Sequence, residues 1–247
     1  MPKFCANLTM MFGEVPLLQR FDAAKQAGFD AVEVLFPYDD PVPDMLDMLG
    51  RNELTLALIN CPPPNYTGGD RGFAAVDGSR FRQDFKRSLR YAKALGAQHL
   101  HIMAGIAQGP RAREVFVENL RWAAAQAPDQ SLTIEPINTH DMPGYFLDDF
   151  DLACAVIREV GAPNLRLQFD AYHAQKITRD VMGTWAKCRD LVVHVQVAQT
   201  PDRSEPDQGQ IEYPAFFARL DADGYKGWVS GEYNPAGDTR AGLGWIG

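Results

Sequence analysis

The regular alternation of short apolar runs with helix-like segments is the feature that most constrains how this chain can fold. Eight runs of strand character span residues 4–7, 31–35, 55–59, 99–103, 132–135, 165–170, 191–197 and 227–232. Helical segments lie between them, at residues 16–27, 43–52, 79–95, 112–126, 148–160, 179–187 and 213–222. Strict alternation of strands and helices indicates a parallel sheet whose strands are joined by helical crossovers.

Eight such units favour a closed (β/α)8 barrel, a TIM barrel, over an open doubly wound sheet. The 247 residues match the roughly 250 residues of this fold, so we expect one domain covering residues 1–247. Only residues 239–245 remain for an eighth helix, which is therefore expected to be short or truncated. The stretch 60–78 is rich in Pro and Gly and is predicted to be a long functional loop.

The acidic balance of the chain argues against two classes of partner. The formal net charge is −8, which makes the protein a poor candidate for coating nucleic acid or an anionic membrane. A small anionic substrate remains compatible with this charge, because a pocket for it needs only one or two cations. The sequence leaves the oligomeric state open, and a homo-oligomer is compatible with it.

No targeting or membrane segment stands out in the sequence. The start of the chain has no apolar stretch long enough for a signal peptide, and no run approaches the roughly 18 apolar residues of a membrane span. The four cysteines are widely spaced and form no CxxC pair: Cys5, Cys61, Cys154 and Cys188. We therefore expect a cytoplasmic protein with reduced thiols.

Polar side chains occupy one face of the later predicted strands. Because successive strand residues point to opposite faces, the apolar set is expected to meet the helices and the polar set to point into the barrel. Four of these polar series reach the C-terminal end of their strand with Glu135, Asp170, Gln196 and Glu232. Active sites of this fold lie at that end, so we predict that the four side chains converge on one site.

Three carboxylates and an amide in one place imply a cation. The carboxylates would repel one another unless a divalent ion lay between them, and such hard oxygen ligands suit Mg²⁺ or Mn²⁺. The expected metal ligands are therefore Glu135, Asp170, Gln196 and Glu232. The alternative interpretation is that each is a strand-end residue that simply faces solvent.

Several motifs along the chain resemble the hydroxypyruvate isomerase family, within the xylose-isomerase-like barrel superfamily. They are ANLTMMF, VEVLFPYD, IEPIN, LQFDAYHAQ, HVQVAQTPDRSEPDQGQIEY and GWVSGEYNP, and together they cover nearly the whole chain. IEPIN followed by DMPGY is similar to hydroxypyruvate isomerase proper, whereas the related 2-oxo-tetronate isomerases share most of the other motifs.

The resemblance implies isomerisation of hydroxypyruvate to tartronate semialdehyde, with a small hydroxy- or oxo-acid as substrate. It implies that Glu135 and Glu232 are the catalytic glutamates and that Asp170 and Gln196 complete the metal-binding set. Gln196 stands where many superfamily members carry a metal-ligating histidine, and a neutral amide is a weaker ligand.

The resemblance also implies two substrate-binding residues. His173 and Arg203 match positions that contact substrate oxygens in related epimerases. A planar arginine fork binds a carboxylate well, so Arg203 is the candidate for the acid group of the substrate. His173 is expected at the start of a loop over the barrel mouth. Without the motif, each would pass for an ordinary loop residue.

Three further inner-face residues have no assigned role at this point. His101 and His194 could support the site from behind, although buried histidines are more often satisfied core residues. Glu33 ends the second strand on its polar face and is a candidate member of the same polar network.

Alternative functions remain open. A 2-oxo-tetronate isomerase or a ketose 3-epimerase would use the same pair of glutamates. A metal-dependent hydrolase resembling the apurinic endonucleases would need several histidine ligands and a basic DNA-binding face, whereas this chain has five histidines and a net negative charge. A non-catalytic binding protein on a barrel scaffold is the third alternative, because fold does not fix function.

Overall fold

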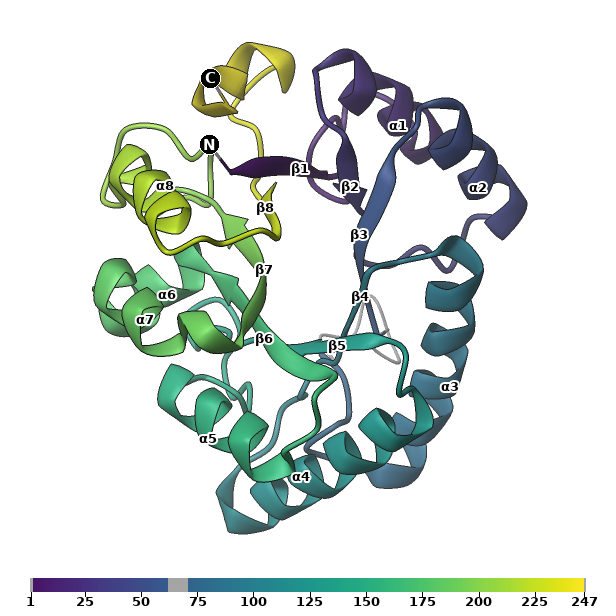
Figure 1. Ribbon diagram of the computed structural model, residues 1–247, viewed down its shortest axis with the longest axis vertical. Helices are drawn as coiled ribbons and strands as arrows, with labels where there is room; N and C mark the ends of the chain where they lie inside the picture. Colours follow the sequence, from purple (N-terminus) through teal and green to yellow (C-terminus); the bar gives the residue numbers. More distant parts are fainter. Residues whose placement is uncertain (1, 62–70, 247) are drawn as a thin grey trace.

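The computed structural model describes residues 2–61 and 71–246, and its eight parallel strands close into a barrel in chain order (Figure 1). The strands are β1 (Lys3–Asn7), β2 (Ala31–Glu33), β3 (Thr55–Asn60), β4 (His99–His101), β5 (Ser131–Ile134), β6 (Leu165–Asp170), β7 (Val192–Val197) and β8 (Trp228–Gly231). The pairing of β1 with β8 closes the ring. This confirms the (β/α)8 barrel that the alternating pattern predicted.

Helices surround the barrel and cover its apolar outer face (Figure 1). They are α1 (Leu17–Gln26), α2 (Val42–Arg51), α3 (Gly78–Leu95), α4 (Gly109–Gln126), α5 (Phe150–Val160), α6 (Ala171–Thr178), α7 (Val181–Cys188) and α8 (Tyr213–Ala222). The core lies between the two layers, where fully buried side chains such as Leu132, Phe169 and Phe216 meet. Residues 62–70 of the predicted functional loop lie outside the described residues.

The connection after β6 differs from its prediction. The sequence predicted a loop that carried His173 and then one helix over residues 179–187, but the structure has two helices, α6 and α7, in this stretch. Asp170 starts α6, because its side chain accepts a hydrogen bond from the backbone N–H of Tyr172 at 2.8 Å. His173 therefore lies in the first turn of a helix, and the prediction of a loop at this position was wrong.

The helix expected after the last strand, β8, is short, as predicted. A 3₁₀ segment, η2 (Arg240–Ile246), takes its place beside β1 and α8 (Figure 1). Trp245 anchors it, with its ring 5.2 Å from that of Phe4 and 6.1 Å from that of Tyr233. Gly231 makes room for this packing, since a Cβ there would lie 2.8 Å from the Trp245 ring.

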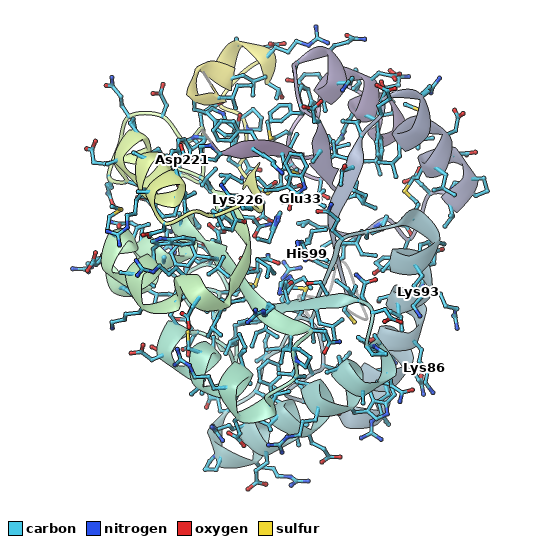
Figure 2. All side chains as sticks on the ribbon, in the orientation of Figure 1. Glu33, Lys86, Lys93, His99, Asp221 and Lys226 are labelled. Carbon is cyan, nitrogen blue, oxygen red and sulfur yellow. The ribbon has the colours of Figure 1, made fainter. Side chains whose placement is uncertain are left out.

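The interior of the barrel is polar, and five of its side chains form a connected set of hydrogen bonds. Thr133 donates to Gln168 at 3.2 Å, Gln168 donates to Gln196 at 2.7 Å, and Gln196 donates to Glu33 at 2.8 Å. Asn7 donates to the same Glu33 oxygen at 2.7 Å. We call these five residues the interior ladder. Figure 2 shows Glu33 and His99 inside the ring of strands, and for Glu33 this is the face that the strand alternation predicted.

Two further sequence predictions can be compared with the structure. Among the described residues, no helix combines the length and the apolar character needed to cross a membrane. The four cysteines are all buried and are present as free thiols.

Candidate active site

Three buried carboxylates lie at the C-terminal ends of the barrel strands. Glu135 directly follows β5, Asp170 is the last residue of β6, and Glu232 directly follows β8. Their exposed fractions are only 4%, 1% and 6%. The strands bring the three acids together at the end of the barrel where this fold places its active sites.

Burial and mutual repulsion dominate the electrostatics of this site. Burial raises the pKa of Glu135 well above its ordinary value, and the nearby charges of Glu232 and Asp170 raise it further. Burial also raises the pKa of Glu232 to about 8, although the positive charge of Arg203 opposes the shift. The pKa of Asp170 is raised for the same first reason. Each of these shifts favours the protonated form of the acid, and a cation beside the acids would favour the charged form.

Arg203 is the cation that the structure itself provides. Its Nη2 lies 2.8 Å from Glu232 Oε2 and 3.3 Å from Asp170 Oδ2, and its Nε donates to the Glu232 carbonyl at 3.3 Å. The guanidinium lies 5.0 Å from the centre of the Tyr172 ring. The backbone φ of Arg203 is 53°, a left-handed conformation that a side chain rarely adopts. These contacts bring Arg203 to the acids, as the sequence prediction of a site residue requires.

His173 faces the same group of acids from the first turn of α6. Its Nε2 lies 3.6 Å from Asp170 Oδ2, and its other ring nitrogen, Nδ1, contacts the side chain of Asn138 at 2.7 Å. Burial, followed by the charge of Arg203, lowers the pKa of His173 well below its ordinary value. The imidazole is therefore neutral in this environment.

Gln196 lies on β7, next to Asp170 in the sheet. The register pairs it with Asp170 on β6 and with Ser230 on β8, two residues before Glu232. Its oxygen accepts from Gln168 and its nitrogen donates to Glu33, so both ends of the amide are used within the interior ladder. The Glu33 carboxylate only accepts hydrogen bonds, which fixes which way the Gln196 amide points. The structure thus joins Gln196 to the interior ladder, in register with Asp170.

The chemistry of the donor groups fits a divalent cation. Carboxylate oxygens of Glu135 and Asp170 and a ring nitrogen of His173 lie within 4.8 Å of one another. Glu135 Oε1 is buried and has no hydrogen-bond partner among the described residues. Glu232 adds a third carboxylate whose charge acts on Glu135. An oxygen-rich, electron-rich group of this kind is the environment that Mg²⁺ or Mn²⁺ prefers.

Sequence reasoning did not assign three residues that contact the site. His101 Nε2 lies 3.7 Å from Glu135 Oε2 and has no hydrogen-bond partner among the described residues. Asn138 and Asp141 follow β5 in a loop and contact each other at 3.0 Å. The strand alternation placed His101 inside the barrel, but no periodic signal marks loop residues such as Asn138.

Comparison with known proteins agrees with this geometry. A family profile described as "Xylose isomerase-like TIM barrel" matches residues 21–247. The 2-oxo-tetronate isomerase of Cupriavidus necator is 45% identical over 100% of this chain and 98% of its own length. The hydroxypyruvate isomerase of Escherichia coli is 38% identical over the same shares of both chains.

Solved structures are also similar to this chain. A crystal structure titled "AP endonuclease, family 2" from Brucella melitensis has a TM-score of 0.96 and 43% identity, and covers 100% of this chain and 98% of that one. The apo structure of the 3-keto-D-glucoside 4-epimerase YcjR from E. coli, at 19% identity and a TM-score of 0.80, shares the fold. The chain belongs to the xylose isomerase-like TIM barrel family. It is an isomerase, like its curated full-length relatives.

Proposed function

We propose that the protein interconverts hydroxypyruvate and tartronate semialdehyde through an enediolate. One observation carries the proposal: two buried glutamates with raised pKa values, Glu135 and Glu232, stand at the ends of β5 and β8. These strands are three positions apart in the ring of eight, so the two carboxylates approach a bound molecule from different sides. The named relatives, a hydroxypyruvate isomerase and a 2-oxo-tetronate isomerase, support the substrate class.

The reaction needs two groups that move protons. One glutamate removes the proton from C3 of hydroxypyruvate, which gives a planar enediolate, and the other delivers a proton to C2. The hydroxyl proton passes from the oxygen on C3 to the oxygen on C2, so no atom is gained or lost. A carboxylate with a pKa raised toward neutrality, such as Glu232 at about 8, is suited both to accept and to return a proton.

His173 and Arg203 are proposed to hold the substrate. The neutral His173 ring points its Nε2 toward Asp170, at 3.6 Å from Oδ2, which supports a role for this nitrogen in holding a substrate oxygen near the acids. Arg203 is bound through Nη2 and Nε, and its Nη1 makes no hydrogen bond to a described residue. That nitrogen is the proposed donor to the substrate carboxylate.

A divalent ion, Mg²⁺ or Mn²⁺, is proposed to be held by Glu135, Asp170 and Glu232. When bound, it would supply Lewis-acid stabilisation of the negative charge that develops on the substrate oxygens. The prediction that Gln196 is also a ligand receives less support, because its oxygen already accepts from Gln168. We propose that Gln196 instead supports the site through its hydrogen bonds in the interior ladder.

Substrate length separates the two closest candidate reactions. A 2-oxo-tetronate has the same reacting carbons as hydroxypyruvate but carries one more CH₂OH group on C3. Rates on hydroxypyruvate, 2-oxo-tetronates and free ketoses, measured with Mg²⁺ or Mn²⁺ present, decide between them. The proposal predicts the highest kcat/KM for hydroxypyruvate. A higher value for a 2-oxo-tetronate would reassign the substrate, and turnover of ketoses alone would overturn the acid substrate.

The endonuclease title of the Brucella structure motivates one further assay. An endonuclease of this superfamily would bind several zinc ions through histidines, and only His173 joins a cluster of three or more potential metal ligands among the described residues. The proposal therefore predicts no nicking of DNA that contains abasic sites, with Zn²⁺ added. Nicking that is lost in Glu135→Gln would overturn it.

A cytoplasmic location is proposed as well. The free, buried thiols support it, because a reducing compartment keeps cysteines in this state. Fractionation of the source cells, followed by detection of the chain, tests the location.

A further inference from the structure

The side chain of Asn138 determines how His173 can act. Asn138 Nδ2 lies 2.7 Å from His173 Nδ1, and the backbone N–H of Asn138 points to the same ring nitrogen at 3.4 Å. Both groups on Asn138 are N–H donors if the amide is oriented as the structure has it. His173 Nδ1 must then accept, which leaves the single proton of a neutral imidazole on Nε2.

Asp141 fixes the orientation of the Asn138 amide. Asn138 Oδ1 accepts from the backbone N–H of Asp141 at 3.0 Å, and Asn138 Nδ2 donates to Asp141 Oδ2 at 3.0 Å. Turning the amide over would place an oxygen against a carboxylate and a nitrogen against an N–H group. The orientation is therefore set by chemistry and not by a choice between two equivalent positions.

Asp141 is a reliable acceptor in this arrangement. Burial favours its neutral form, but hydrogen bonds from surrounding side chains hold its pKa well below the ordinary value. These neighbours are Asn138, His140, Tyr172 and Lys176. Tyr172 also stacks under the guanidinium of Arg203, so the same carboxylate is connected to both proposed substrate-binding side chains.

We propose that Asn138, held by Asp141, is a positioning residue that keeps the proton of His173 on Nε2. In this form His173 donates a hydrogen bond to a substrate oxygen, and it has no lone pair on Nε2 for a metal ion. The cluster of Glu135, Asp170 and His173 would otherwise allow His173 to act as a ligand. The inference rests on the proposed function for the identity of the acceptor, but the position of the proton does not depend on it.

Nitrogen NMR of the intact protein, labelled with ¹⁵N-histidine, reads the proton position directly. The His173 signals are assigned by their loss in His173→Gln. The expected spectrum has a protonated Nε2 and an unprotonated Nδ1, both without metal and with Mg²⁺. A protonated Nδ1 in the wild-type protein would overturn the inference, whatever the activity on oxo-acids proves to be.

Variants of Asn138 test the consequence. Asn138→Asp replaces the donor by an acceptor, so the proton should move to Nδ1 and kcat/KM should fall by roughly 10–100-fold, the usual effect of losing a supporting hydrogen bond. Asn138→Ala removes the side-chain donor, so it should lower the activity, and the His173 proton should not be confined to one ring nitrogen. His140→Ala, which removes an exposed neighbour of Asp141, is the matched control and should stay within about twofold of the wild type. Full activity and an unchanged proton position in Asn138→Asp would contradict the proposal.

A separate pair of residues supports a second inference. Cys154 on α5 and Cys188 at the end of α7 are 34 residues apart in sequence, and their sulfur atoms lie 3.2 Å from each other. Both are buried, with exposed fractions of 4% and 0%. The thiol–thiol hydrogen bond lowers the pKa of Cys154, which favours the nucleophilic thiolate.

We propose that Cys154 and Cys188 form a disulfide when the protein meets a peroxide. Two S–H bonds break and one S–S bond forms, and the two electrons and two protons reduce hydrogen peroxide to two molecules of water. The bond would enclose β6 and α6, the segment that carries Asp170 and His173. It would thus connect α5 and α7 around one side of the proposed active site.

Thiol counting under denaturing conditions tests this pair. Peroxide treatment should reduce the count from four thiols to two, and peptide mapping should link residue 154 to residue 188. The melting temperature should rise by roughly 5–10 °C, because the closed loop restricts the unfolded chain. Cys154→Ser and Cys188→Ser should abolish both changes, whereas Cys5→Ser and Cys61→Ser should retain them. Four persistent thiols, or a bond that maps to Cys5 or Cys61, would overturn the proposal.

Discussion

Two buried glutamates in the same barrel behave in opposite ways. Glu33 lies in the interior and Glu135 at the mouth, and both are almost fully shielded from solvent. Burial alone would raise the pKa of each. The pKa of Glu33 is nevertheless lowered, because the hydrogen bond and charge of His194 and the hydrogen bond of Gln196 outweigh burial. The pKa of Glu135 is raised by burial, and the neighbouring charges of Glu232 and Asp170 raise it further.

The difference lies in the partners that each carboxylate finds. Three N–H groups converge on Glu33, from Asn7, Gln196 and His194, at 2.7, 2.8 and 2.7 Å. Glu135 has an oxygen without a partner among the described residues. A buried charge with all its hydrogen bonds made supports the fold, whereas one with open positions is available for a ligand, a proton or a cation.

The largest expected effect concerns the mouth of the barrel. Glu135→Gln or Glu232→Gln should lower kcat by roughly 10²–10⁴-fold, because an amide cannot carry the proton between carbons. Steady-state rates on hydroxypyruvate measure the loss, and circular dichroism checks that the fold is retained. A rate near that of the wild type in either variant would remove that glutamate from the mechanism.

A substitution in the barrel interior should instead lower the stability of the protein. Glu33→Gln places an amide NH₂ among donors, and breaking such a buried pair costs on the order of 3 kcal/mol in the free energy of unfolding. Glu135→Gln, the matched substitution at the mouth, should change it by less than about 1 kcal/mol or increase it, since it removes repulsion. Urea unfolding compares the free energies of unfolding of the two variants, provided that both show the same dependence on urea concentration. Equal losses for both variants would show that the two sites do not differ in this way.

A divalent ion should act on the mouth only. Mg²⁺ or Mn²⁺ at about 100 times its dissociation constant should add about 2.7 kcal/mol to the stability of the folded protein, or roughly 5–10 °C in melting temperature. Asp170→Asn should lose most of this shift. An undiminished shift in the variant, measured by calorimetry, would place the ion elsewhere.

The pH dependence of stability sharpens the same comparison. The pKa of Glu232 is about 8 in the folded protein against an ordinary value of 4.5, so between these values the folded state keeps a proton that the unfolded chain has lost. Without divalent ions, stability should therefore fall as the pH rises from about 5 to 8, by at most about 1.4 kcal/mol per pH unit for this proton. Glu232→Gln should flatten the curve. An identical slope in the variant would assign the proton to another group.

The sequence predicted the fold and the face of each inner residue, because strand alternation and helix periodicity follow from backbone geometry. It did not predict which partners each inner side chain finds. Gln196 is on the inner face as expected, but both ends of its amide are used by Gln168 and Glu33. It also did not predict α6. Asp170 was interpreted only as a site residue, although aspartate is a common N-cap residue, the position that directly precedes a helix.

Strand alternation and helix periodicity could not assign roles to the loop residues. Asn138 and Asp141 act through side-chain contacts between a loop and a helix, and no spacing rule in one sequence connects them to His173. His101 was placed inside the barrel by alternation, but its distance from Glu135 depends on how the ring of strands closes.

Asp170 shows how a single position can limit what evolution can change. One of its oxygens begins α6 and the other lies beside Arg203 and His173. Asparagine could keep the first contact but not the charge, and glutamate could keep the charge but would move it away from the helix start. A descendant of this chain that acquires a new reaction is therefore freer to vary the loops than this residue, whose replacement would alter the local backbone and the chemistry in the same step.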